Sequence, residues 1–470
     1  MSNKGLRETP FHKNDRLREI VDSIDRKEKD SVNPSYAALA QETPSRFKDD
    51  VEVKRDERTN FARDRDRIIY SKSFYNLAGK TQVFLSPKNP FISDRMTHTL
   101  HVSSIARTIA RAIHLNEDLV EAIAFGHDLG HSPFGHLGEQ ILTELCNRHG
   151  IGRYKHNEQS LRVIDYLEKH GDGLNLCLEV RDGVVTHCGE EKGGEFWAAE
   201  EPHDWDPFKG SLDKREPYTL EGCLVKLCDK IAYVGKDIED AIEVGLISPE
   251  DLPGSCTELL GDTNTEIINT LVLDLIDNFK KDLEDFREEH GRDPGRTEIP
   301  IRLSEEVANA LDELIFDFNY DNIYMCDVNM EYAEKTSVII EGLFDAYHEE
   351  LTELSLSDPK AVDDMELPKG VEQKEITSLS VDEIEKKIEK GPGSEEDLKR
   401  LRALKQEIIQ QSLEDFNGDK TSILFFLQGM HEKYLKLAKP AEMVRDSITQ
   451  MTDNMAISIF KSLKIPQPVF

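Results

Sequence analysis

Apolar side chains recur along most of the chain at intervals of three and four residues, the spacing of one face of an α-helix. The first clear case is residues 98–114, whose expected buried face carries Leu100, Ile105, Ile109 and Ile113. The next is residues 116–130, with Asn116 as the expected N-cap and Gly126 and Gly130 near the end. The short connection predicts that these two helices pack antiparallel.

Further helical segments follow in the same pattern. Residues 157–171 read as an amphipathic helix closed by Gly171, and helical periodicity returns over residues 401–463. Residues 220–245 are the longest periodic run, and their expected buried stripe carries Leu224, Leu227, Ile231, Val234, Ile238 and Ile242. Strand-like alternation is scarce and we find no internal repeat, so the pattern predicts an all-α protein.

The composition of successive segments indicates how the chain is organised. Residues 1–58 form an N-terminal extension, and residues 59–350 form the core. Residues 188–218 are rich in Gly, Pro and acidic groups and read as a surface loop of that core. Residues 352–400 are heavily charged and poor in aromatic side chains, which is typical of a variable insertion. Residues 401–470 then read as C-terminal helices that pack on the core.

Charge and cysteine content narrow the class of protein. The formal net charge of −33 repels nucleic acid, so we expect no nucleic-acid partner. No run approaches the ~20 apolar residues of a spanning helix and the N-terminus is polar, so we expect neither a membrane span nor an export signal. Seven cysteines without a CxxC pair favour reduced thiols in the cytoplasm. Cations at positions 54–67 are compatible with an anion pocket or with a solvated helix face.

Histidines are concentrated in one part of the chain. Eight of the fifteen fall between His98 and His156, three of them in the decapeptide HDLGHSPFGH at residues 127–136. A single histidine is most often a surface or hydrogen-bonded structural residue, and we assign no role to the pair His203-Asp204. Their density at the end of an apolar helix favours metal binding or proton transfer instead.

The expected packing of the helices suggests that this cluster binds a metal ion. The antiparallel arrangement brings His98 close to His127 and Asp128, while Asp229 lies within a third apolar helix. A buried carboxylate is costly without a partner. One divalent cation held by these four side chains would satisfy Asp229, and two imidazoles with two carboxylates suit Mn, Fe, Co, Ni or Zn, and less ideally Mg. A purely structural polar cluster remains the alternative at this point.

Several motifs in a fixed order carry a family resemblance. They are RDRDRIIYSKSFYNLAGKTQVF (63–84), THTLHV (97–102), HDLGHSPFGHLGE (127–139), KHNEQSLRV (155–163) and CDKIAYVGKDIEDA (228–241). Together they resemble the HD-domain superfamily and, more narrowly, the deoxyguanosinetriphosphate triphosphohydrolase family. The resemblance is dense over residues 59–242 and weaker beyond. It implies an all-α fold, in which additional peripheral helices surround an HD-domain helical core.

The resemblance also implies the site residues. It implies one divalent metal ion per site, Mn²⁺, Mg²⁺ or another transition metal, with the ligands His98, His127, Asp128 and Asp229. It implies a catalytic group made up of His136, Glu139, His131 and His156, the last two lining the phosphate site. It implies substrate contacts from Arg95 and Lys230 to phosphate, Tyr233 to the sugar, Asp237 to the 3′-hydroxyl, and Asn76 with Leu77 to sugar or base.

The implied reaction is hydrolysis of a deoxynucleoside triphosphate, with dGTP the leading substrate, to deoxynucleoside and inorganic triphosphate. Water attacks the α-phosphate, His136 protonates the leaving oxygen and Glu139 orients His136. Another HD phosphohydrolase, acting on a cyclic dinucleotide, (p)ppGpp or a nucleoside monophosphate, and a non-catalytic nucleotide sensor remain alternatives. The Tyr233/Asp237 register with the upstream KTQVF favours the first function.

Two properties of the family concern partners and regulation. The resemblance implies a homo-oligomer, a hexamer, and a possible dNTP effector. Asn76 stands where relatives commonly carry Arg or Gln, which leaves base preference open. Residues 352–400 match no segment of the family pattern.

Overall fold

Helices make up nearly all the regular structure of the chain. The computed structural model describes residues 31–39, 46, 58–84, 91–188, 192–203, 205–206, 208, 216–356, 379–392 and 394–464. Within them the named strands are β1 (Glu195–Phe196) and β2 (Ile301–Arg302), which pair antiparallel with Glu195 opposite Arg302. The all-α fold predicted from the sequence is therefore confirmed.

The helices divide into an N-terminal and a C-terminal series. The first comprises α2 (Asn60–Ile69), α3 (Lys72–Asn76), α4 (Arg95–Ala112), α5 (Glu117–Gly126), α6 (Gly135–Arg148), α7 (His156–Arg162), α8 (Glu168–Gly171), α9 (Leu178–Thr186), α10 (Leu220–Glu243), α11 (Gly254–Leu260), α12 (Asn264–His290) and α13 (Glu305–Asp312). The second comprises α14 (Asp327–Glu353), α15 (Val381–Glu389), α16 (Glu395–Glu414), α17 (Ile423–Leu427), α18 (Glu432–Leu437), α19 (Pro440–Thr449) and α20 (Asp453–Lys464). Tighter or wider turns occur in η2 (Leu77–Gly79), η3 (Val163–Leu167), η4 (Pro249–Asp251) and η5 (Glu313–Tyr324).

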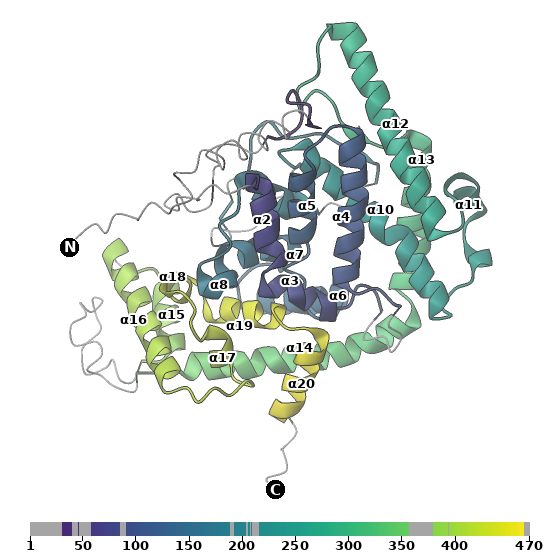
Figure 1. The fold of residues 1–470 in the computed structure, drawn as a ribbon. Coiled ribbons are helices and arrows are strands. Elements are labelled where there is room, and N and C mark those ends of the chain that lie inside the picture. The colour runs from purple at the N-terminus through teal and green to yellow at the C-terminus, as the bar shows by residue number, and fades with distance from the viewer. Residues whose placement is uncertain are drawn as a thin grey trace.

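A bundle of four helices, α2, α4, α5 and α10, forms the centre of the molecule (Figure 1). Asn116 caps α5 as expected, because its side chain accepts hydrogen bonds from the backbone of Asp118 and Leu119. The predicted stripe of α10 is buried from Leu224 through Ile238. The bundle therefore supplies three rigid helices, α4, α5 and α10, whose facing residues can build a site.

Two sequence expectations about local packing are wrong. Leu100 is 49% exposed, because it lies about 140° around α4 from Ile105 when each residue turns about 100°. Residues 157–171 do not form one amphipathic helix: α7 passes into the π-type turn η3, and Lys169 and His170 adopt positive φ. The side chains from Gln159 to Glu168 are buried, since both sides of this segment pack against other elements.

The C-terminal helices lie against the bundle. The long helix α14 crosses one end of the molecule and contacts α6, α19 and α20 (Figure 1). Asp453, at the start of α20, accepts a hydrogen bond from the Phe134 backbone at 2.9 Å. The Lys80 ammonium donates to the carbonyls of His131 and Thr449, at 2.5 and 2.7 Å. These contacts support the turn at residues 131–135 from outside the bundle.

The described parts of the segments expected to be peripheral pack against the rest of the protein. Within residues 188–218, β1 pairs with β2, and Phe196 is buried with its ring centroid 5.0 Å from the Lys226 ammonium and 5.8 Å from the Lys230 ammonium. Within residues 352–400, helix α15 buries Val381 and Ile384. Of residues 1–58, the described Tyr36 is buried. None of the helices in the described part of the chain has the length and apolarity needed to cross a membrane.

Candidate metal centre

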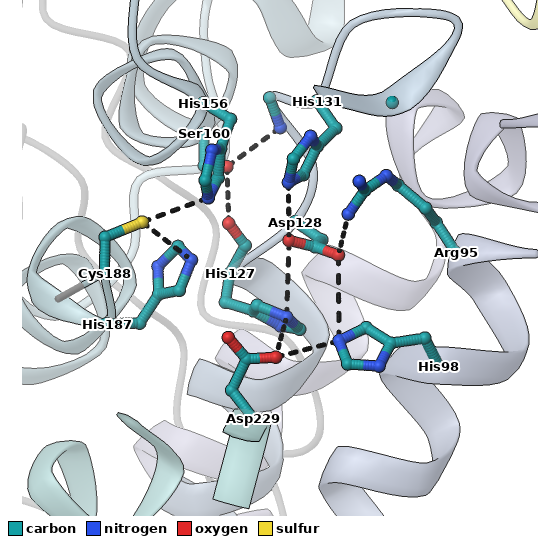
Figure 2. A network of polar contacts seen from close by, with 12 residues as sticks. Arg95, His98, His127, Asp128, His131, His156, Ser160, His187, Cys188 and Asp229 are labelled. Carbon is teal, nitrogen blue, oxygen red and sulfur yellow. Dashed lines mark hydrogen bonds and ion pairs between the residues drawn. The ribbon is translucent and has the colours of Figure 1, made fainter. Parts of the chain in front are cut away.

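Three helices bring the predicted metal ligands together (Figure 2). His98 lies in the first turn of α4, His127 and Asp128 directly follow α5, and Asp229 lies within α10. His98 Nε2 is 2.9 Å from Asp229 Oδ1 and 4.0 Å from Asp128 Oδ2. His127 Nε2 is 3.3 Å from Asp128 Oδ1 and 3.7 Å from Asp229 Oδ1. Two imidazole nitrogens and two carboxylates thus face a common point.

The orientation of His127 suits a metal ligand. Its Nδ1 donates to the Ala124 carbonyl at 2.6 Å, which directs Nε2 into the site. Burial lowers the pKa of His127 to about 4, so the ring is neutral near pH 7. Nε2 is fully buried and, among the described residues, has no hydrogen-bond partner. A buried acceptor of this kind is costly unless a cation or a donor occupies the site.

Two carboxylates in one buried site need positive charge. Burial raises the pKa of Asp229, but the hydrogen bond from His98 and the charges of the histidines outweigh it and hold that pKa well below its usual range. Asp128 accepts from the Arg95 guanidinium at 2.8 Å. The side chains present therefore fit a divalent cation with borderline N/O ligands.

Arg95 also has unused donors. The side chain is only 2% exposed. Its Nε and Nη2 make no hydrogen bond to any described residue. Guanidinium groups bind phosphate through such parallel donors, so the nitrogens beside Asp128 can receive an anionic ligand.

Helix α7 and the turn before α6 add more imidazoles. His131 Nε2 lies 3.3 Å from Asp128 Oδ1. The His131 ring stacks on His156 with centroids 3.9 Å apart. The His136 ring is 6.2 Å from His131, and His136 is exposed. The three predicted catalytic histidines thus form a row, His156–His131–His136, in which His131 contacts Asp128 and His136 is the exposed end.

Glu139 has a hydrogen-bond partner that the sequence did not suggest. It accepts hydrogen bonds from the backbone nitrogen and from ring Nδ1 of His156, at 3.0 and 3.0–3.1 Å. The carboxylate spans from the first turns of α6 to the start of α7, so it orients His156. The expectation that Glu139 orients His136 came from their spacing along one helix and did not include α7.

The predicted sugar contacts continue along α10 from Asp229. Tyr233 is half-buried, and Asp237 is buried one further turn along the same face. Asp237 Oδ2 accepts from the Tyr324 hydroxyl at 2.7 Å, while Oδ1 has no hydrogen-bond partner in the described structure. Burial raises the pKa of Asp237 to about 7. Asp237 therefore keeps one oxygen available to a ligand.

Three other predicted substrate residues have packing contacts. Leu77 is fully buried in the core, and the Asn76 amide donates to the Gln450 carbonyl at 2.8 Å. The Lys230 ammonium lies 5.8 Å from the centroid of the Phe196 ring. The structure thus does not bring Asn76 and Leu77 into the network of Figure 2.

Sequence reasoning missed three residues near the centre. Lys80, quoted only within KTQVF, is buried and binds the His131 carbonyl. His187 lies with its ring 4.9 Å from that of His127. Cys188 lies beside both His187 and His156. The adjacent His-Cys pair after an apolar helix was the only local signal for the last two.

Gly130 allows the close approach that holds this turn. Its N–H donates to Ser160 Oγ at 2.8 Å, and Ser160 Oγ donates to the His127 carbonyl at 2.6 Å. A β-carbon at Gly130 would lie 2.1 Å from the Ser160 backbone nitrogen. The turn and α7 could not both keep their positions with any other residue here.

We expect Gly130→Ala to lower the free energy of unfolding by roughly 1–3 kcal/mol, the usual cost of overpacking. Unfolding in urea, monitored by circular dichroism, measures this change in free energy. Gly254→Ala is the matched control, because a β-carbon there meets no atom within 4 Å. Equal stability of the two variants would show that the turn does not depend on this contact.

Comparison with known proteins identifies the domain in which the cluster lies. A family model for the HD domain matches residues 95–234, from the start of α4 into α10. The fold and this match define an HD-domain protein.

Relatives of known description narrow the family. The chain is 40% identical over 339 residues to a deoxyguanosinetriphosphate triphosphohydrolase-like protein of Caldanaerobacter subterraneus subsp. tengcongensis, covering 72% of this chain and 85% of the relative. Proteins of the same description from Desulfatibacillum aliphaticivorans (41% identity; 62% and 74% covered) and Ralstonia pickettii (36% identity; 66% and 81% covered) also match. The chain belongs to the deoxyguanosinetriphosphate triphosphohydrolase-like family. The HD domain and these relatives support a metal-dependent phosphohydrolase.

Proposed function

We propose that the protein hydrolyses deoxynucleoside triphosphates, dGTP foremost, to deoxynucleoside and inorganic triphosphate. The observation that carries the proposal is a set of buried nitrogens without partners in the described structure, Nε2 of His127, Nε and Nη2 of Arg95 and Nδ1 of His131, around two carboxylates. The carboxylates and Nε2 groups are ligands for a cation, and the guanidinium beside them can bind an anion. A phosphate ester bound next to a divalent ion meets both needs. The relatives' names favour dGTP.

His98, His127, Asp128 and Asp229 would hold the divalent ion. When bound, it supplies Lewis-acid polarisation of a phosphoryl oxygen and acidifies a water molecule. The nature of the ligands suits Mn²⁺ or another transition metal, and less well Mg²⁺. Binding of the ion would remove the free-energy cost of burying the His127 acceptor without a partner and the two carboxylates facing each other.

Basic and polar side chains around the centre would bind the triphosphate. Arg95 lies closest to the metal ligands and would hold the α-phosphate through its unused donors. His131 and His156, whose rings stack on each other, would contact the remaining phosphates, and Glu139 would orient His156. Lys230, on α10 beside Asp229, would add positive charge.

His136 would act as the proton donor. Water attacks the α-phosphorus and gives up a proton to solvent, the bond from phosphorus to the 5′-oxygen breaks, and that oxygen takes a proton from the His136 imidazolium. An alkoxide is a poor leaving group, so this proton lowers the barrier. His136 is exposed at the outer end of the histidine row, where it can regain a proton from solvent.

The test is to incubate the purified protein with each dNTP and each NTP in the presence of Mn²⁺ or Mg²⁺. The proposal predicts deoxynucleoside and triphosphate in equal amounts, separated by chromatography, with dGTP among the best substrates. Release of phosphate or pyrophosphate instead, or turnover only of cyclic dinucleotides, (p)ppGpp or monophosphates, would replace it by another HD phosphohydrolase activity.

The sugar contact gives a second prediction. Tyr233 would pack against C2′ and leave no partner for an added hydroxyl, and burying an unpaired hydroxyl costs roughly 1–3 kcal/mol. We therefore expect kcat/KM for GTP to be lower than that for dGTP by roughly 5- to 150-fold. Tyr233→Ala should narrow this ratio, mainly by lowering activity on dGTP.

Asp237→Ala should instead weaken hydrolysis of dGTP and GTP alike. Both nucleotides carry a 3′-hydroxyl, from which Oδ1 of Asp237 would accept a hydrogen bond. Tyr332→Ala, at an exposed tyrosine on α14, is the control and should leave the ratio unchanged. A wild-type protein that cleaves GTP as well as dGTP would rule out this role of Tyr233.

A further inference from the structure

A second group of metal-binding side chains lies beside the proposed centre, at the end of α9 and the start of α7 (Figure 2). Cys188 Sγ is 3.0 Å from His156 Nε2 and 3.4 Å from His187 Nε2. Ligand atoms of the three residues all lie within 4.8 Å of one another. The sulfur therefore faces two imidazole nitrogens at once.

Both imidazoles are oriented from behind. Nδ1 of His156 is hydrogen-bonded to the Glu139 carboxylate at 3.0 Å, and Nδ1 of His187 to the Val184 carbonyl at 2.7 Å. Histidines that bind metals usually donate their second ring nitrogen to such a carboxylate or carbonyl. This arrangement fixes the proton on Nδ1 and directs the Nε2 lone pair of each ring toward Cys188.

We propose that Cys188, His156 and His187 form a second cation site, selective for thiophilic ions of the zinc class. With Zn–S near 2.3 Å and Zn–N near 2.0–2.1 Å, tetrahedral geometry places sulfur and nitrogen about 3.6 Å apart. The observed 3.0 and 3.4 Å need only a small expansion. Binding would release the thiol proton to solvent and leave a fourth position for water or an anion.

The two sites would select different ions. Thiolate with two imidazoles favours Zn²⁺, whereas Mn²⁺ and Mg²⁺ favour the carboxylate-rich set around Asp229. A zinc-class ion at Cys188 would also take Nε2 of His156 away from the triphosphate. This regulatory consequence, inhibition by zinc, rests on the proposed function, but ion binding itself does not.

The first test counts metal ions in the full-length protein. After equilibration with Zn²⁺ and removal of excess, elemental analysis should find two equivalents in the wild type. Cys188→Ser should hold one, and Asp229→Ala should also hold one, now at the cysteine. Cys256→Ser is the matched control and should hold two, since Cys256 belongs to neither ligand group and its thiol donates to the Ala310 carbonyl at 3.6 Å.

Cobalt shows which ligands are used. Co²⁺ bound by a thiolate has an absorption band from sulfur-to-metal charge transfer, which we expect in the wild type and in Asp229→Ala but not in Cys188→Ser. A ligand atom of His187 also lies within 4.8 Å of His127 and Asp229. If His187 serves the first centre instead, the wild type will bind one equivalent without this band, and the second site is refuted.

Alkylation tests the wild type without any substitution. Cys188 is half-buried, whereas the other six cysteines are buried. Zn²⁺ should slow the reaction of Cys188 with iodoacetamide at least about tenfold, as measured by peptide mass spectrometry. An unchanged rate would contradict the proposal.

Inhibition links the site to turnover. In Mn²⁺-supported hydrolysis of dGTP, added Zn²⁺ should inhibit the wild type at a concentration at least about tenfold lower than it inhibits Cys188→Ser. Equal inhibition would refute the regulatory consequence. A protein inactive on every nucleotide that still binds two zinc ions, one through a thiolate, would refute the proposed function and leave the second site intact.

Discussion

Asp229→Ala should abolish both Mn²⁺ binding and nucleotide hydrolysis while leaving the protein folded. Asp229 is the ligand that α10 brings to the pair of helices α4 and α5, and its Oδ1 lies within 2.9 Å of His98 Nε2 and 3.7 Å of His127 Nε2. Removing it leaves one carboxylate, Asp128, which is already paired with Arg95. Too little negative charge then remains to offset the dehydration of a divalent ion.

Elemental analysis after loading with Mn²⁺, together with circular dichroism, measures this outcome. Glu239→Ala is the control, since it removes a carboxylate from an exposed position of the same helix. It should keep Mn²⁺ and activity. Full Mn²⁺ occupancy in Asp229→Ala would mean that the metal site lies elsewhere.

His136→Ala should keep metal and substrate but lose on the order of 10²–10⁴ in kcat, the usual contribution of a general acid. His136 lies at the exposed end of the histidine row, with its ring 6.2 Å from that of His131. It makes up no part of the buried metal cluster, so removing it should affect the leaving group and not the ion.

A change of leaving group separates these effects. An aryl phosphodiester that releases p-nitrophenolate needs little protonation, so we expect His136→Ala to hydrolyse it at nearly the wild-type rate. His290→Ala, at an exposed histidine at the end of α12, should match the wild type on both substrates. An equal loss on the aryl ester and on dGTP would contradict the proton-donor role.

Local sequence signals were sufficient for the helices because apolar spacing and capping act over a few residues. Asn116 capped α5 as expected, and the stripe on α10 is buried. Leu100 was misplaced because a spacing of five residues puts it about 140° around the helix from Ile105, off the buried face. The π-type turn after α7 depends on packing against neighbouring elements, which local periodicity cannot show.

The sequence predicted which residues make up the candidate site better than it predicted which of them contact one another. The motifs and the family resemblance named His98, His127, Asp128 and Asp229, and the structure brings these four together. Pairings between distant segments were not visible. Glu139 contacts a residue 17 positions away, and Cys188 one 32 positions away, because the ends of α6, α7 and α9 meet only in the folded chain.

Some expectations stay predictions. The hexamer, the dNTP effector and the cytoplasmic location come from the resemblance and the composition. The base preference is also untested, because Asn76 and Leu77, which are expected to contact sugar or base, lie outside the network around Asp229 (Figure 2). Leu77 is a core residue and Asn76 is half-buried, and their contact with sugar or base stays a prediction.

Hydrolysis in ¹⁸O-labelled water tests the central claim most directly. The protein is incubated with dGTP and Mn²⁺, the products are separated, and their masses are measured by mass spectrometry. Attack on the α-phosphorus with loss of the 5′-oxygen predicts equal amounts of unlabelled deoxyguanosine and of triphosphate carrying one ¹⁸O. Label in the deoxyguanosine, or release of pyrophosphate or phosphate in place of triphosphate, would contradict the account.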